Sequence, residues 1–137
     1  MNTYIAVAIL LVGSFCLLQA TVVKINVCVR LKFLTTNSNN ELPKAPPPLT
    51  LKVRNGTNTH DILRQAAKLD SRYAFTTKAY SFGHMVTSIS GVHQDHTNSK
   101  YWMIYSDPNT LTPTGIDHYR PKDGSCVIFK YEKLSLV

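Results

Sequence analysis

The sequence has few acidic residues and none of the motifs that mark the common enzyme classes. Only 8 of its 137 residues are Asp or Glu, against 15 Lys and Arg, and no two acids stand as a candidate catalytic pair. Gly-x-Ser-x-Gly nucleophile motifs and glycine-rich phosphate loops are absent. These absences argue against the familiar hydrolase and nucleotide-dependent sites. We therefore expect a binding protein, with no catalytic residues and no catalytic cofactor.

No charged side chain precedes Lys24, and the apolar run in this region is short. Residues 5–18 are almost entirely apolar, but a membrane-spanning helix needs about twenty such residues. Ala20 offers a small-residue cleavage site, so residues 1–20 are predicted to be a secretory signal peptide and residues 21–137 one extracellular domain without a membrane span. An uncleaved amino-terminal anchor is the alternative, because the segment before the run lacks Lys and Arg.

The net charge of +7 is carried by basic residues that occur singly from Lys24 to Lys133, never in a run. Nucleic-acid-binding proteins usually gather these residues on one face or element. We therefore expect no nucleic-acid partner, and interpret the charge as solubility with a mild preference for anions. A heparin-like partner stays open, although no motif supports one.

Apolar periodicity predicts a β-rich domain with one helix. Alternation predicts strands over residues 23–33, 49–53, 73–80, 85–89, 101–105 and 126–131, and helical spacing predicts a helix over 58–69. One helix must then cover the apolar face of the strands. The predicted fold class is α+β, with a single mixed β-sheet, one helix packed on it, and the first and last strands adjacent in a β-grasp-like layout.

Two cysteines remain after the predicted signal peptide, which contains Cys16. Cys28 lies on the polar face of the first strand, and Cys126 lies opposite the apolar face of the last. Both thiols point away from the core on strands that could be neighbours, the arrangement that a disulfide needs in an oxidising compartment. Two unpaired thiols are the alternative.

The sequence Asn55-Gly56-Thr57 is an acceptor for N-glycosylation, which agrees with export. A plain Asn-Gly turn is an equally good interpretation of the same residues.

The histidines do not form a recognisable metal motif. His93 and His96 lie three residues apart with Asp95 between them, but no second pair of ligands completes a zinc site. A solvated polar loop explains them better. His118 follows Asp117, and adjacent side chains on a strand point apart, so we expect a surface histidine and no metal ligands.

Aromatic and apolar residues near two bends are better candidates for a binding surface. Phe82 and Met85 flank Gly83 at a bend, where binding and packing are equally plausible roles. Trp102 lies within a predicted strand, which favours a core position over a ligand contact.

Four blocks of sequence resemble a known family. Residues 81–89, 101–102, 107–110 and 115–124 resemble the carboxy-terminal β-domain of the transcobalamin and gastric intrinsic factor family, in order and in spacing. The resemblance extends over roughly residues 23–131. It implies vitamin B12 transport, because the family binds cobalamin between a large helical barrel and this small β-domain. The imidazole that approaches cobalt in some members belongs to the helical half and is carried over to no histidine here.

Carried over residue by residue, the resemblance implies ligand contacts at two segments: Phe82, Gly83, His84 and Met85, and Leu111, Thr112, Pro113 and Thr114. Phe82 replaces a tryptophan or serine of the relatives, and Thr112 and Thr114 stand where transcobalamin has leucine and glutamine. Two functions follow. The first is a secreted cobalamin (corrinoid) binding module, weak alone or completed by a separate helical-domain protein. The second is a secreted β-domain that binds another small ligand or a protein partner.

Overall fold

The computed structural model describes residues 22–135, and the predicted signal peptide lies outside this range. The elements in chain order are β1 (Lys24–Phe33), β2 (Leu49–Arg54), α2 (Thr59–Leu69), the 3-10 turn η1 (Ser71–Tyr73), β3 (Phe75–Tyr80), β4 (Gly83–Ile89), β5 (Val92–His93), β6 (Lys100–Ser106), β7 (Thr110–Leu111) and β8 (Cys126–Lys133). Within residues 22–135, no helix is long and apolar enough to cross a membrane.

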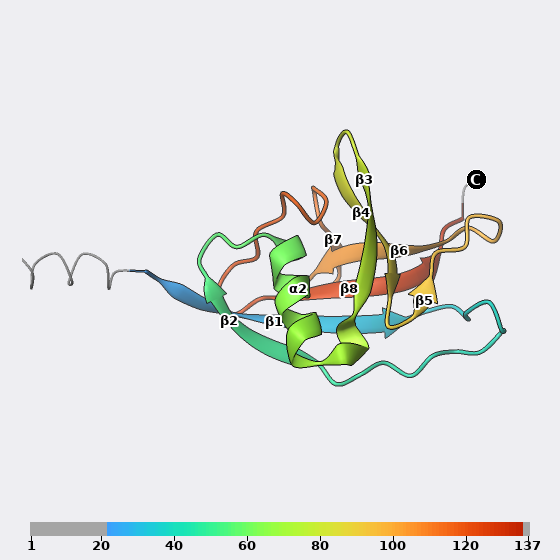
Figure 1. The fold of residues 1–137 in the computed structure, drawn as a ribbon, viewed down its shortest axis with the longest axis horizontal. Helices are drawn as coiled ribbons and strands as arrows, with labels where there is room; N and C mark the ends of the chain where they lie inside the picture. The colour runs from blue at the N-terminus through green and yellow to red at the C-terminus, as the bar shows by residue number, and fades with distance from the viewer. Residues whose placement is uncertain (1–21, 136–137) are drawn as a thin grey trace, which may run out of the picture.

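A five-stranded sheet in the order β2-β1-β8-β6-β7 forms the base of the molecule. The first and last strands, β1 and β8, are parallel neighbours at its centre, as predicted, and the other pairs are antiparallel. From Ile25 to Leu31 every second residue of β1 is buried, which follows the period of a half-buried strand. This inner face is covered by α2 and by the β3–β4 hairpin (Figure 1).

The prediction of a single sheet is wrong in one respect, because β3, β4 and β5 form a second, antiparallel sheet. The chain reverses tightly at Ser90 and Gly91, both with positive φ, so that β5 returns along β4 for only two residues. The sheets are joined by side chains: Trp102 Nε1 donates to the Val92 carbonyl over 2.8 Å, and Tyr131 Oη donates to the His93 carbonyl over 2.9 Å. The α+β class with one α-helix among residues 22–135 is confirmed.

Helix α2 begins and packs as its sequence predicts. The Asn58 side chain accepts a hydrogen bond from the Asp61 N–H and caps the helix. Ile62, Leu63 and Ala66 are fully buried. Burial stabilises large apolar side chains such as Ile62 and Leu63 by about 1.5–3 kcal/mol each. The strand predicted from residue 73 instead starts at Phe75. The residues before it form η1, because the Asp70 side chain accepts from the Arg72 N–H.

The disulfide between Cys28 and Cys126 is present, as predicted from the outward faces of the two strands. The cysteines are direct register partners in the parallel β1–β8 pair, with Cα atoms 4.2 Å apart. The bond therefore joins the two central strands of the large sheet.

Candidate functional site

The first predicted ligand segment is the tip of the β3–β4 hairpin, which projects from the body of the molecule (Figure 1). The Phe82 side chain is 64% exposed and stacks on Tyr80, with ring centroids 5.2 Å apart and planes only 9° apart. Lys78 Nζ lies 5.4 Å from the Tyr80 ring centroid. The hairpin thus presents a pair of stacked aromatic rings to solvent, an arrangement suited to covering a flat apolar ligand.

Met85 lies further along the hairpin and is half-buried. Its Sδ accepts a hydrogen bond from Gln94 Nε2 over 3.6 Å, which holds the thioether on the side of β5. Met85 is therefore less available to a ligand than Phe82.

The second predicted ligand segment, residues 111–114, follows the short strand β7. Leu111 is 53% exposed, and Pro113 and Thr114 are also exposed. The Thr112 hydroxyl donates to the Thr114 carbonyl over 2.9 Å, so its proton is used within the loop. This segment therefore presents to a ligand the apolar side chain of Leu111, the hydroxyl of Thr114 and the backbone of a hydrogen-bonded loop.

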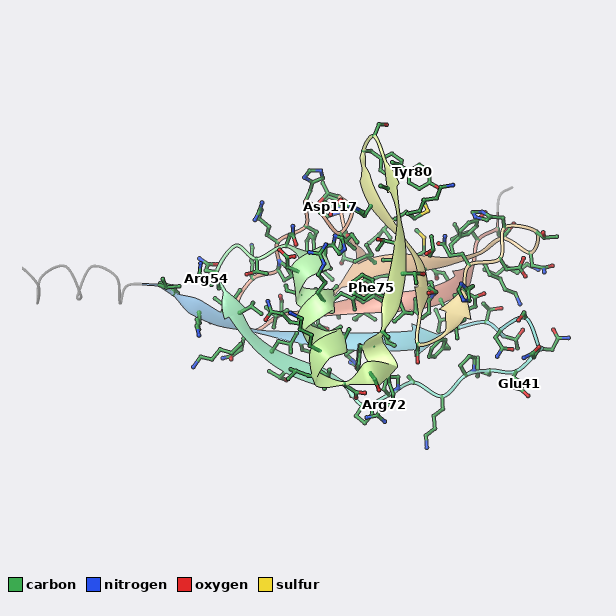
Figure 2. All side chains as sticks on the ribbon, viewed as in Figure 1. Glu41, Arg54, Arg72, Phe75, Tyr80 and Asp117 are labelled. Carbon is green, nitrogen blue, oxygen red and sulfur yellow. A yellow bond between two sulfur atoms is a disulfide. The ribbon has the colours of Figure 1, made fainter. Side chains whose placement is uncertain are left out.

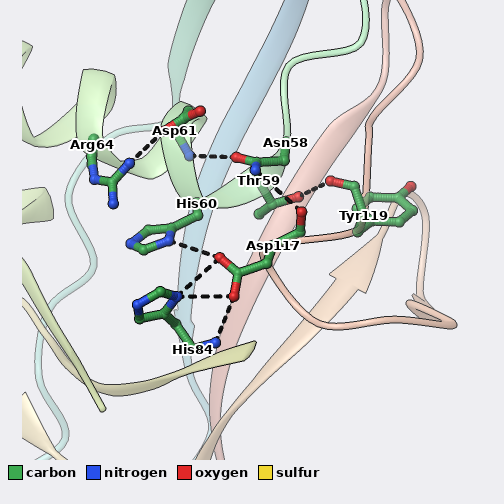
Figure 3. A network of polar contacts seen from close by, with 8 residues as sticks. All are labelled: Asn58, Thr59, His60, Asp61, Arg64, His84, Asp117 and Tyr119. Atoms are coloured by element: carbon green, nitrogen blue, oxygen red, sulfur yellow. Dashed lines mark hydrogen bonds and ion pairs between the residues drawn. The ribbon is translucent and has the colours of Figure 1, made fainter. Parts of the chain in front are cut away.

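Asp117 connects the two predicted segments. Its carboxylate accepts the His84 backbone N–H over 2.6 Å at the start of β4, and the segment that carries Asp117 directly follows residues 111–114. Figure 2 shows Asp117 between the start of α2 and the β3–β4 hairpin. The same carboxylate lies 2.9 Å from His84 Nδ1 and 3.0 Å from His60 Nδ1 (Figure 3). The tip end of the hairpin and the 111–117 loop are therefore held together by one side chain.

These contacts set the ionisation of Asp117. Burial alone would raise the pKa of the carboxyl group, but the hydrogen bonds from the His84 backbone and the His84 and His60 rings outweigh it and lower the pKa to about 2. The close approach also requires a glycine at position 83. A Cβ there would lie 2.6 Å from Asp117 Oδ2, and φ of Gly83 is +124°.

The first turn of α2 fixes the Asp117 segment from the other side. Both the Thr59 N–H and the Thr59 hydroxyl donate to the Tyr119 carbonyl over 2.9 Å, and the His60 N–H donates to the Ile116 carbonyl over 3.0 Å. Asn58 Nδ2 donates to the Asp117 carbonyl over 3.1 Å. Residues 115–119 are therefore anchored to a helix terminus.

The histidines considered as metal ligands in the sequence do not come together in a metal site. His93, His96 and His118 are exposed, and His96 Nδ1 lies 3.3 Å from the Tyr101 hydroxyl. Among residues 22–135, the group with three potential metal ligands is instead His60, His84 and Asp117. Sequence reasoning missed this group because its members lie in three separate elements. Trp102 is 5% exposed, and its core position is confirmed.

The positive charge is less evenly distributed than the sequence indicates. Five basic side chains from three elements line one groove of about 450 Å³ between β2 and α2: Lys24, Lys52, Arg54, Arg64 and Lys68. Asp61 is the acidic residue in this groove, and it is paired with Arg64.

Asn55 is exposed in the turn after β2, and its glycosylation stays a prediction.

Comparison with known proteins places this arrangement in a family. The family described as "Domain of unknown function (DUF4430)" matches residues 56–133. Transcobalamin-2 of Bos taurus is 33% identical over 78 residues, covering 57% of this chain and 17% of the relative. An uncharacterized protein of Drosophila melanogaster is 28% identical over 97 residues, covering 63% of this chain and 16% of the relative.

Two solved structures share the fold. Haptocorrin in complex with Cbi superposes with a TM-score of 0.69 at 19% identity, over 81% of this chain and 25% of haptocorrin. A protein of Ruminococcus gnavus superposes with a TM-score of 0.53 at 11% identity, over 81% of this chain and 99% of that protein. The chain spans about a sixth of the length of the curated relatives. It belongs to the DUF4430 family, and its domain is a transcobalamin-like C-terminal domain, related to cobalamin-binding proteins.

Proposed function

We propose that this domain is a corrinoid-binding module whose ligand wall is formed by the β3–β4 hairpin tip and the 111–114 loop. The observation that carries the proposal is the stacked, exposed pair Phe82 and Tyr80 at the hairpin tip, which Asp117 connects to the loop through His84. The relatives named transcobalamin-2 and the structure of haptocorrin with Cbi support the ligand class.

The chemistry of the two segments suits a large flat ligand with polar edges. The Phe82 ring can lie against an apolar macrocycle face, while Leu111 adds apolar area from the loop. The Thr114 hydroxyl and the loop backbone can meet amide side chains at the ligand edge. Gly83 and His84 support the wall from behind, since both contact Asp117.

A domain that contacts only one face of the ligand is expected to bind it weakly. It leaves the opposite face of a corrinoid in water, while capture still costs at least about 4 kcal/mol in lost freedom of motion. We therefore expect a dissociation constant nearer micromolar for the described domain by itself. A separate helical-domain protein that covers the open face would tighten it.

Titration with cyanocobalamin, followed by calorimetry and corrin absorbance, tests the proposal. Phe82→Ala should weaken binding by about 1–2 kcal/mol, because it removes the exposed stacked ring. Thr114→Ala should weaken it less. Leu69→Ala is the matched control, since Leu69 is an exposed apolar residue on α2, and it should bind as wild type. Absence of heat and of spectral change at millimolar ligand, with and without helical partners, would contradict the proposal and favour another ligand or a protein partner.

We also propose that the protein is secreted, with the mature chain starting at Thr21. The Cys28–Cys126 disulfide supports this, because such bonds persist mainly in oxidising compartments. Intact-mass analysis of protein from the culture medium should show a chain starting at Thr21. A further mass loss on treatment with a glycosidase would identify glycan at Asn55. An intact amino terminus on membrane-bound protein would contradict the proposal and favour an anchor.

A further inference from the structure

Two histidines and one aspartate converge where the start of β4, the first turn of α2 and residues 115–119 meet (Figure 3). The candidate ligand atoms of His60, His84 and Asp117 all lie within 4.8 Å of one another. His60 Nδ1 is 3.0 Å and His84 Nδ1 is 3.2 Å from the same carboxylate oxygen, Asp117 Oδ1. Neighbouring ligand atoms in a tetrahedral zinc site are about 3.3 Å apart when each bond is about 2.0–2.1 Å long. Two of the three required separations are therefore close to those of a metal site.

We propose that His60, His84 and Asp117 form a binding site for a divalent transition-metal ion, with Zn²⁺ as the ion that fits best. Two imidazole nitrogens and one carboxylate oxygen are a donor set that zinc uses where a fourth position stays open. Mg²⁺ and Ca²⁺ prefer oxygen ligands, so the two nitrogens select against them. The His84 side chain is 41% exposed, which gives the ion a path from solvent and leaves room for a water in the fourth position.

Existing contacts already hold the three ligands in place before an ion binds. The His60 N–H is bonded to the Ile116 carbonyl, and the His84 N–H is bonded to Asp117 Oδ2. Asn58 Nδ2 holds the Asp117 carbonyl. The His60 side chain is 6% exposed and is packed against the Phe75 ring with centroids 5.8 Å apart. The exposed His84 ring must turn to bring the Nδ1 atoms of His60 and His84 closer together. Because only this ring has to move, the conformational entropy lost on metal binding is small.

When both imidazoles are neutral, entry of the ion requires a change of tautomer and no net loss of protons. The carboxylate of Asp117 only accepts, so a neutral imidazole beside it donates its Nδ1 proton to it. Coordination uses the Nδ1 lone pair, and therefore this proton leaves and a proton is taken up at Nε2. Each imidazole stays neutral, and a metal–nitrogen bond replaces each Nδ1–H···O bond.

Calorimetry with Zn²⁺ on the disulfide-bonded protein, without corrinoid, tests the proposal. Wild type should bind one Zn²⁺ per chain and show no comparable affinity for Mg²⁺. His84→Ala and Asp117→Asn should each weaken Zn²⁺ binding by at least about 100-fold, since even residues behind metal ligands contribute 10–100-fold. The double variant His93→Ala/His96→Ala, which removes two exposed histidines outside the cluster, is the matched control and should keep wild-type affinity.

A second readout does not depend on variants. Nitrogen NMR of wild type should show the Nδ1 signals of His60 and His84 shifting with Zn²⁺ while His93 and His118 do not. No binding at millimolar Zn²⁺, equal affinity of wild type and Asp117→Asn, or an equal loss in the control variant would overturn the metal site. Because the measurement uses the metal alone, its failure would leave the corrinoid proposal untouched.

Discussion

Gly83 is the residue whose replacement the structure constrains most sharply. Its φ of +124° is unfavourable for any side chain, and a Cβ would lie 2.6 Å from Asp117 Oδ2. Gly91 also has positive φ, at +75°, but open space surrounds its missing Cβ. We predict that Gly83→Ala lowers the free energy of unfolding by about 2–3 kcal/mol, because strain and a lost carboxylate contact combine, and that Gly91→Ala costs about 1 kcal/mol from strain alone. Urea denaturation of both variants measures this difference, and equal losses would contradict it.

Tyr105 lies on the outer face of the large sheet and donates its hydroxyl to the Glu132 carboxylate. This hydrogen bond, with desolvation and the negative charge of Glu132, raises the pKa of Tyr105 to about 12. Because the pKa of Tyr105 is raised in the folded state, the Tyr105–Glu132 hydrogen bond stabilises the folded protein at pH values below the ordinary tyrosine pKa near 10. This stabilisation is lost as the pH rises towards 12. The difference between the ultraviolet titrations of wild type and of Tyr105→Phe should show Tyr105 ionising at a higher pH than an ordinary tyrosine. In Glu132→Gln this ionisation should move to lower pH, and an unchanged midpoint would contradict this cause.

At the scale of elements, the disulfide strengthens the central strand pair. It joins β1 and β8, whose cysteines are 98 positions apart in the chain, so it restricts nearly the whole unfolded domain. The chain-entropy model gives about 4.7 kcal/mol for such a loop, reduced by any strain in the folded state. We predict that Cys28→Ser/Cys126→Ser lowers the free energy of unfolding by about 2–4 kcal/mol. Denaturation of the variant beside oxidised and reduced wild type measures it. A loss below about 1 kcal/mol would show that the pairing of β1 and β8 already restricts the chain.

The elements that could be predicted are those with a long, regular pattern. β1 alternates over its whole length, and this alternation placed Cys28 on the outer face and so predicted the disulfide. α2 has a capping residue and an apolar face within one continuous segment. The two-residue strands β5 and β7 carry no such pattern, because their positions depend on turns and on neighbouring strands. The division into two sheets therefore could not be deduced from periodicity.

The cluster of His60, His84 and Asp117 illustrates a different limit. His60 lies in a helix, His84 follows a bend and Asp117 belongs to an irregular segment, so no local spacing relates them. Their meeting depends on how the start of α2 docks on residues 115–119, which is a tertiary contact. The family resemblance predicted the two segments near this cluster, but it did not predict the carboxylate that joins them.

At the scale of the whole molecule, two sheets share one hydrophobic core. Val86, Ile89 and Val92 from the small sheet pack in the same cluster as Trp102 and Tyr131 from the large sheet. The hydrogen bond from Trp102 to the Val92 carbonyl also crosses between the sheets. A domain with one core is expected to unfold as one cooperative unit.

Ile89→Ala tests this unity, because Ile89 is fully buried in the small sheet, while the backbone amides of β8 report on the large sheet. Truncation should cost about 2–5 kcal/mol through lost apolar contact and the cavity left behind. If the sheets unfold together, the free energies of opening measured by amide hydrogen exchange in β4 and in β8 fall by the same amount. Leu111→Ala, at an exposed position outside the core, should shift both by less than about 0.5 kcal/mol. Faster exchange in β4 with unchanged exchange in β8 would show that the hairpin carrying Phe82 unfolds separately. The proposed ligand wall would then be joined to the large sheet less firmly than the shared core indicates.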